Sequence, residues 1–191
     1  KFTLKKKKEA KAVMSFSEKK NHISNQTYRT AVMILSDKGA KGERKDESGP
    51  LIIKLLEDVE EDSYQVVCSV LLPDEQSVIE QTLRNLCDVE KLDLILTTGG
   101  TGLSPRDVTP EATLAVAERN VPGIAEYMRA KSFEITPKAM LSRGVAVLRG
   151  KTLIINLPGS PKAVKEQLEF IPALPHGLDI LLGRDGECGG R

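Results

Sequence analysis

The sequence predicts an α/β protein, a three-layer αβα sandwich whose sheet is mostly parallel with one possible antiparallel pair. Short apolar runs rich in β-branched residues alternate along the chain with segments in which apolar residues recur at helical spacing. A tight turn containing glycine joins the last two apolar runs. Such alternation is typical of a parallel sheet with helices on both faces.

Five apolar runs predict the strands of this sheet. In chain order they cover residues 30–35, 64–72, 92–98, 145–148 and 153–157. A polar, glycine-containing loop follows the first run through Gly49. The four-residue turn between the last two runs, at 149–152, is short enough to join antiparallel neighbours.

Helical spacing of apolar residues and N-terminal signals predict the helices. They are expected over residues 51–59, 78–86 and 171–182, and from Thr109, Pro122 and Ser160 onward. Asp74 is the expected N-cap of the second helix. In Thr109-Pro110-Glu111, Thr is expected to cap free amides, Pro fits the first turn, and Glu complements the positive end of the helix dipole.

The charge distribution divides the chain into a basic extension and an acidic body. The net charge is only +1, but residues 1–29 hold nine Lys or Arg and two Asp or Glu, whereas the rest holds 19 basic and 25 acidic residues. We expect residues 1–29, with the lysine run 5–8, to be a solvated arm. One domain at 30–182 and a flexible tail at 183–191 complete the expected organisation.

Several classes of protein are excluded by what the sequence lacks. No window approaches the roughly 20 consecutive apolar residues of a membrane span, and the basic N-terminus has no signal-peptide core. We therefore expect a cytoplasmic protein. Cys68, Cys87 and Cys188 lie far apart without metal-binding spacing, so neither a disulfide framework nor a zinc site is expected.

Chemistry is expected in the loops beyond the carboxyl ends of the parallel strands, where ligands of such sheets bind. Gly99-Gly100-Thr101-Gly102 follows a strand, and its glycines allow backbone amides to turn toward a phosphate. The P-loop and dinucleotide fingerprints are absent. A tight strand exit would explain the same glycines without any ligand.

Acidic and basic residues flank this glycine-rich loop. Asp107, next to Arg106 and before a helix, could hold Mg²⁺ against phosphate oxygens, and Asp74 follows the neighbouring strand. A surface ion pair or a helix cap would explain the same residues without function. Two acidic loops nevertheless suit a site for polyphosphate in which a metal neutralises charge.

A second anion site is expected at Pro158-Gly159-Ser160 with Lys162, where a hydroxyl, free amides and an ammonium group meet at a helix start. Two such sites suit a reaction that joins two phosphorylated molecules. His22 and His176 show no catalytic spacing. Lys131, Arg143 and Arg149 are expected to be ordinary surface residues.

Four separated segments carry a family resemblance: LPDE at 72–75, TTGGTGLSPRDVTPEAT at 97–113, LSR at 141–143 and GKTLIINLPGSPKAV at 150–164. Together they resemble the Mog/MoaB family of molybdenum cofactor biosynthesis proteins, closest to the Mog type, and the G domain of gephyrin. The resemblance covers roughly residues 30–182. It implies a molybdopterin adenylyltransferase that transfers AMP from Mg·ATP to the molybdopterin phosphate and releases pyrophosphate.

The resemblance also implies roles for individual residues. Asp74 and Asp107 would be catalytic and would hold Mg²⁺. Nucleotide would be bound by Ser36, Asp37, Gly99, Gly100, Thr101 and Gly102. Molybdopterin would be bound by Pro158, Gly159, Ser160 and Lys162. The family implies a homotrimer and a separate molybdenum insertase as partner, with no nucleic acid and no membrane involved.

Three alternatives stay open from the sequence. A MoaB-type relative would share the fold but form a higher oligomer with weaker or different activity. A non-catalytic molybdopterin-binding module would support an insertase. Nucleic-acid binding through the lysine-rich extension would depend steeply on salt.

Overall fold

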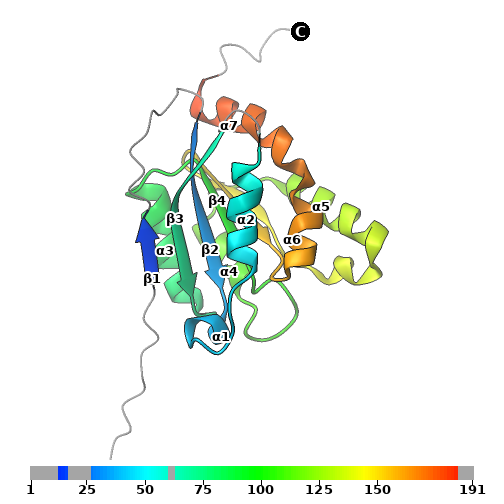
Figure 1. Cartoon of the computed structure of the whole chain (residues 1–191). Coiled ribbons are helices and arrows are strands. Elements are labelled where there is room, and N and C mark those ends of the chain that lie inside the picture. The colour runs from blue at the N-terminus through cyan, green and yellow to red at the C-terminus, as the bar shows by residue number, and fades with distance from the viewer. Residues whose placement is uncertain (1–12, 17–26, 60–62, 185–191) are drawn as a thin grey trace, which may run out of the picture.

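A seven-stranded sheet forms the centre of the computed structural model, which describes residues 13–16, 27–59 and 63–184 (Figure 1). The strands are β1 Val13–Phe16, β2 Tyr28–Leu35, β3 Tyr64–Leu72, β4 Leu94–Thr98, β5 Arg119–Asn120, β6 Ala146–Arg149 and β7 Thr152–Leu157. Their order is β1-β3-β2-β4-β7-β6-β5. The central strands β3, β2, β4 and β7 run parallel, and β1, β6 and β5 pair antiparallel.

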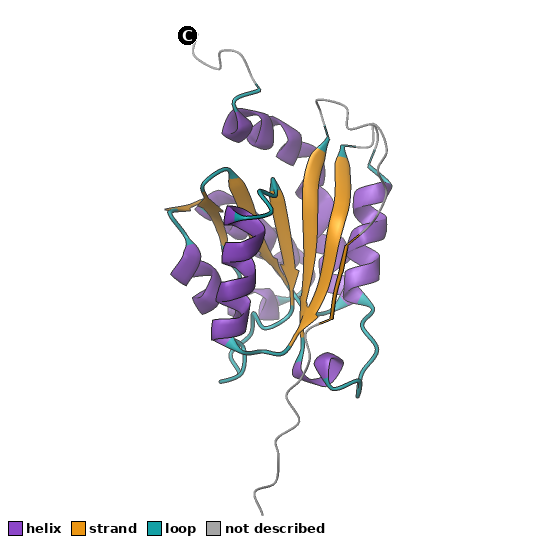
Figure 2. Ribbon diagram, turned by 90° about the vertical axis from the view of Figure 1, so that its left-hand side faces the viewer, coloured by secondary structure: helices purple, strands orange, loops and turns teal. Residues whose placement is uncertain are grey.

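Helices cover both faces of this sheet, as Figure 2 shows. The α-helices are α1 Asp37–Ala40, α2 Ser48–Glu57, α3 Gln76–Asp88, α4 Thr109–Val116, α5 Pro122–Ile135, α6 Pro161–Gln167 and α7 Leu174–Leu182. Two 3₁₀ helices span Pro137–Leu141 and Leu168–Ala173. The predicted three-layer α/β architecture and the antiparallel β6–β7 pair are therefore confirmed.

The two faces of the sheet bury separate apolar cores because successive side chains of a strand point to opposite faces. In β4, Leu94 and Leu96 pack with α2, α5, α6 and α7, whereas Ile95 packs with α3 and α4. Strand β4 is buried at all five positions. Burial on both faces explains why Leu94, Ile95 and Leu96 follow one another in β4 instead of alternating with polar residues.

Four elements differ from the sequence prediction. The short helix α1 lies in the first loop, the two-residue strand β5 was not expected, and α7 begins at Leu174 after a 3₁₀ turn instead of at Ile171. Strand β1 lies within the expected basic extension and pairs antiparallel with β3. The lysine run 5–8 and residues 185–191 of the expected tail 183–191 lie outside the described residues.

Two predicted helix caps are wrong. Glu75, not Asp74, occupies the cap position of α3 and makes no side-chain cap bond. Thr109 is the first residue of α4 instead of its cap, and its hydroxyl donates to the Gly99 carbonyl at 2.9 Å. In both cases the polar side chain forms a hydrogen bond with a residue outside the helix start, Asp37 for Asp74 and Gly99 for Thr109. Ser160 does cap α6, since its hydroxyl accepts from the Ala163 N–H at 3.2 Å.

A buried asparagine joins the sheet to α4. The Asn156 amide nitrogen donates to the Thr97 and Thr113 hydroxyls at 3.0 and 2.9 Å, and its oxygen accepts from the Val145 N–H at 3.3 Å. We expect Asn156→Leu to lower the free energy of unfolding by about 2 to 3 kcal/mol, because it leaves buried polar groups without partners. Chemical denaturation measures this loss.

The matched control is Asn85→Leu, the same change on the exposed surface of α3. It should alter stability by less than about 0.5 kcal/mol. Equal small losses in the two variants would show that the buried amide does not stabilise the fold.

Cys68 and Cys87 are buried free thiols, and burial raises the pKa of each to about 11. This agrees with inert thiols, whereas Cys188 lies outside the described part of the chain. None of the helices in that part is long and apolar enough to span a membrane.

Candidate functional site

Four loops meet at one edge of the sheet because their strands are parallel and end in register. The last pairs of that register are Leu35 with Leu72, Ile34 with Thr98, and Thr98 with Leu157. A cleft of about 360 Å³ opens between these loops and the segment before α2. Its lining residues are Ile34, Leu35, Ser36, Gly39, Arg44, Lys45, Asp46, Glu47, Ser48, Asp74, Thr98, Gly99, Gly100, Asp107, Gly159, Ser160 and Pro161.

The cleft brings together seven of the twelve predicted site residues. These are Ser36, Asp74, Gly99, Gly100, Asp107, Gly159 and Ser160. The other five, Asp37, Thr101, Gly102, Pro158 and Lys162, lie outside the lining. Lys162 is 81% exposed, and its ammonium group lies 3.9 Å from the Glu166 carboxylate.

Gly99 and Gly100 form a sharp exit from β4 that other residues would not fit. Their φ angles are +101° and +63°, in the region that favours glycine. A Cβ atom on Gly99 would lie 2.2 Å from the Leu35 carbonyl oxygen, and one on Gly100 would lie 2.3 Å from the Thr109 hydroxyl. The glycines therefore allow this backbone to lie against β2 and α4.

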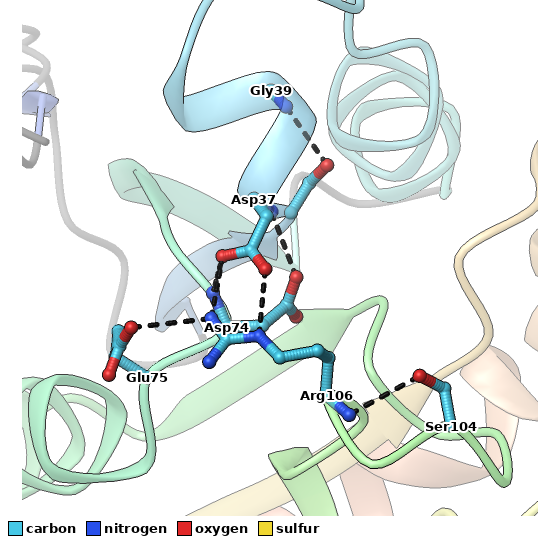
Figure 3. Close-up of polar contacts among 7 residues, drawn as sticks. Asp37, Gly39, Asp74, Glu75, Ser104 and Arg106 are labelled. Atoms are coloured by element: carbon cyan, nitrogen blue, oxygen red, sulfur yellow. Dashed lines mark hydrogen bonds and ion pairs between the residues drawn. The ribbon is translucent and has the colours of Figure 1, made fainter.

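Asp37 and Asp74 exchange hydrogen bonds between the loops after β2 and β3 (Figure 3). The Asp74 Oδ2 accepts from the Asp37 N–H at 2.8 Å, and the Asp37 Oδ1 accepts from the Asp74 N–H at 3.1 Å. Asp74 Oδ1 is buried and has no hydrogen-bond partner among the residues that the structure describes. Burial, together with the neighbouring Asp37 and Asp107 carboxylates, raises the pKa of Asp74 against the bond from the Asp37 amide and the attraction of Arg106.

Arg106 links the glycine-rich loop after β4 to the loops after β2 and β3. Its Nε and Nη2 donate to the two carboxylate oxygens of Asp37 at 2.9 Å each, and Nη2 lies 3.3 Å from Glu75 Oε1. These bonds hold the pKa of Asp37 below its usual value despite partial burial. The pKa values of two neighbouring carboxylates are thus shifted in opposite directions, down for Asp37 and up for Asp74.

Asp107 lines the cleft from a loop that is tied at several points. Its Oδ2 accepts from the Ser104 N–H at 2.9 Å, and its own N–H donates to the Ser104 carbonyl at 2.9 Å. Arg143 also holds this loop: it donates to the carbonyls of Gly102 and Asp107 and to the Glu111 carboxylate. The expectation that Arg143 is an ordinary surface residue is therefore wrong.

Sequence reasoning missed the segment 44–48, which forms one wall of the cleft. Arg44 and Lys45 line the cleft, and in the part of the chain that the structure describes neither side chain has an ion-pair or hydrogen-bond partner. Asp46 Oδ1 accepts from the N–H groups of Ser48 and Gly49 at 3.0 and 3.2 Å. The spacing Asp46-Glu47-Ser48-Gly49 is a local turn signal that could have placed a helix start here.

The donor set of the cleft suits a hard cation shared with phosphate. In the described ranges no group of three or more His, Cys, Asp and Glu side chains could hold a metal by itself. Asp74 and Asp107 both line the cleft, and the buried Asp74 Oδ1 has no other partner. Because Mg²⁺ is commonly bound by one or two carboxylates together with substrate phosphates, these residues fit it.

Comparison with known protein families shows which family has this sequence. The family model described as "Probable molybdopterin binding domain" matches residues 31–176, which include all four loops of the cleft. The chain belongs to this family. The predicted resemblance to molybdenum cofactor biosynthesis proteins is thereby confirmed.

Relatives in the molybdopterin-binding family are similar over most of their length. A molybdopterin adenylyltransferase of Haemophilus influenzae is 48% identical over 143 residues, covering 75% of this chain and 72% of the relative. One of Helicobacter pylori strain J99 is 43% identical, covering 83% and 90%. A solved structure of the molybdopterin biosynthesis enzyme MoaB from Thermus thermophilus is 49% identical with a TM-score of 0.77, covering 82% of this chain and 98% of that chain.

Proposed function

We propose that the protein is a molybdopterin adenylyltransferase of molybdenum cofactor biosynthesis. An oxygen of the molybdopterin phosphate attacks the α-phosphorus of ATP, the bond from that phosphorus to the β-bridging oxygen breaks, and pyrophosphate leaves. The observation that carries this proposal is the cleft in which Asp107 and the unpartnered Asp74 Oδ1 lie beside the glycine turn. Relatives named for this activity support it.

Asp74 and Asp107 are the residues that would hold Mg²⁺ in this reaction. When bound, Mg²⁺ neutralises the charge of the triphosphate and of the leaving pyrophosphate. The residues of the chain then position the two substrates. Within the described ranges of the chain, no histidine lines the cleft. The phosphate nucleophile needs no general base, because it is already ionised near neutral pH.

The remaining predicted residues divide between the two substrates. Ser36 and the turn Gly99–Gly100 face the proposed nucleotide site, and Thr101 and Gly102 support the turn through bonds from Arg143 to their carbonyls. Gly159 and Ser160 face the proposed molybdopterin site. Pro158 supports them indirectly, since its carbonyl accepts from the Thr98 hydroxyl at 2.7 Å.

The family resemblance leads us to propose a homotrimer that passes its product to a separate insertase. Adenylyl-molybdopterin contains no molybdenum, so a later step must insert the metal into it. Mass measurement in solution tests the trimer. A MoaB-type relative stays the second candidate, because the similar Thermus structure carries that description.

The deciding experiment is an assay of purified protein with molybdopterin and Mg·ATP. We expect stoichiometric pyrophosphate and adenylyl-molybdopterin, which requires both substrates in one cleft. Folded protein that binds molybdopterin but gives neither product would contradict the proposal and favour a non-catalytic binding module.

Arg44 and Lys45, and not Lys162, are the cations proposed to attract the second anionic substrate. We expect the double variant Arg44→Gln/Lys45→Gln to raise the KM of ATP or of molybdopterin by about tenfold, because a cleft focuses the field of the cations that line it onto a bound anion. Initial rates at varied ATP and molybdopterin measure the change.

Lys162→Gln is the matched control for this double variant. It removes a predicted cation that lies outside the cleft lining and should leave both KM values near wild type. The reverse pattern, a large effect at Lys162 alone, would restore the assignment made from the sequence.

A further inference from the structure

The Asp37 carboxylate lies outside the cleft lining, and both of its oxygens accept hydrogen bonds from protein groups. Its Oδ1 accepts from both the Asp74 N–H and Arg106 Nη2, and its Oδ2 accepts from Arg106 Nε. Asp37 is absent from the cleft lining, whereas its neighbour Asp74 lines it. These contacts argue against a direct role of Asp37 in nucleotide binding.

Arg106 and Asp107 are adjacent in sequence but have different partners. The Arg106 guanidinium reaches the loops after β2 and β3 (Figure 3). Asp107 instead lines the cleft and accepts from the Ser104 N–H. A guanidinium that binds both oxygens of one carboxylate fixes distance and orientation together. The Arg106–Asp37 contact therefore ties the loop of Asp107 to the loops that carry Asp37 and Asp74, in addition to the bonds that Arg143 makes to the same loop.

We propose that Asp37 and Arg106 form a positioning pair that holds the loop of Asp107 against the loop of Asp74, so that both cleft carboxylates serve one bound cation. This inference rests on the proposed function for the identity of the ligand. It assigns Asp37 a role different from the nucleotide contact expected from sequence, and it gives a role to Arg106, for which the sequence alone predicts none.

The Asp37–Arg106 pair is partly exposed to solvent, so we expect it to affect ligand binding more than global stability. Its side chains are 52% exposed at Arg106 and 29% exposed at Asp37, and exposed ion pairs contribute little to global stability. Small displacements of groups that must converge on a ligand are costly to binding and catalysis. Loss of the pair should therefore loosen the loop and weaken ligand binding without unfolding the domain.

The first test measures amide hydrogen exchange across residues 99–108 in ligand-free protein. We expect Arg106→Met to speed exchange at these amides by about tenfold while the denaturation midpoint stays near wild type. Arg149→Met is the matched control, because Arg149 makes a similar two-bond contact with Asp88 remote from the cleft. Unchanged exchange in Arg106→Met would overturn the proposal.

The second test measures binding of Mg²⁺ with α,β-methylene-ATP, which cannot release pyrophosphate. We expect Arg106→Met and Asp37→Asn each to weaken this binding by about tenfold, and the double variant to lose no more than the worse single variant. Losses that multiply would show that Asp37 contacts the ligand independently, which would overturn the pair.

With these two tests, failure of the proposed function can be distinguished from failure of the positioning pair. Exchange and analogue binding do not require turnover, so a wild-type protein without adenylyltransferase activity would contradict the function alone. An active wild type whose loop exchange is unaffected by Arg106→Met would contradict the pair alone.

Discussion

Asp107→Asn is expected to leave the fold intact and to lower turnover by roughly 10²- to 10³-fold, the scale at which a group that stabilises transition-state charge acts. The amide oxygen of Asn can still accept the Ser104 N–H that Asp107 Oδ2 accepts at 2.9 Å. The variant therefore removes a charge while keeping the local hydrogen bond. Pyrophosphate release at saturating Mg·ATP and molybdopterin measures the loss.

Asp93→Asn is the matched control for this experiment. The Asp93 carboxylate also accepts one backbone N–H, that of Arg29 at 2.8 Å, but it lies before β4, at the opposite end of the strand from the cleft. Its turnover should stay near wild type. Near-normal turnover in Asp107→Asn would remove Asp107 from the mechanism, and equal losses in both variants would indicate a general effect of lost carboxylates.

The position of the cleft was predictable because parallel strands end at the same edge of a sheet. The apolar pattern predicts parallel strands over residues 30–35, 64–72 and 92–98, and these strands are neighbours in the sheet. The loops that carry Asp74 and Asp107 therefore had to lie together. That topological argument needs only the identity and direction of the strands. It does not depend on individual side-chain contacts.

The contacts inside the cleft were harder to predict because they join residues far apart in sequence. Local preference made Asp74 a helix cap, but the Asp37 N–H, 37 residues earlier, takes its carboxylate instead. Arg143 looked like a surface residue because two of its partners are backbone carbonyls, at Gly102 and Asp107, which have no sequence signature. Tertiary partners override local propensity at both positions.

The basic extension shows a different limit of sequence reasoning. Composition alone predicted a solvated arm over residues 1–29, yet Val13–Phe16 within it pairs with β3. A four-residue strand at a sheet edge gains its hydrogen bonds from a neighbour that composition does not reveal. Charge bias therefore does not reveal a short strand within a charged segment.

Gly99→Ala is expected to be the most destabilising of the substitutions considered, lowering the free energy of unfolding by about 4 kcal/mol or more. Two effects add at this position. The φ of +101° is strained for any residue with a Cβ atom, and that atom would lie 2.2 Å from the Leu35 carbonyl oxygen. Because the obstacle is backbone of the central strand β2, no side-chain rotation relieves it.

A glycine series separates strain from collision. Gly150→Ala has a φ of +55° but open space around the new Cβ atom, so it should cost roughly 1 kcal/mol for conformation alone. Gly123→Ala, in α5, has neither positive φ nor a neighbour within 4 Å and should be neutral or slightly stabilising. Urea denaturation of the three variants measures the order.

The collision at Gly99 would also reach the cleft, because the Gly99 carbonyl accepts the Thr109 hydroxyl and a Cβ atom on Gly159 would lie 3.2 Å from Gly99 Cα. A shift of Gly99 therefore moves the start of α4 and the loop after β7 together. Equal destabilisation in Gly99→Ala and Gly150→Ala would mean that β2 yields to the new atom, and the glycine turn would then be required for its φ alone.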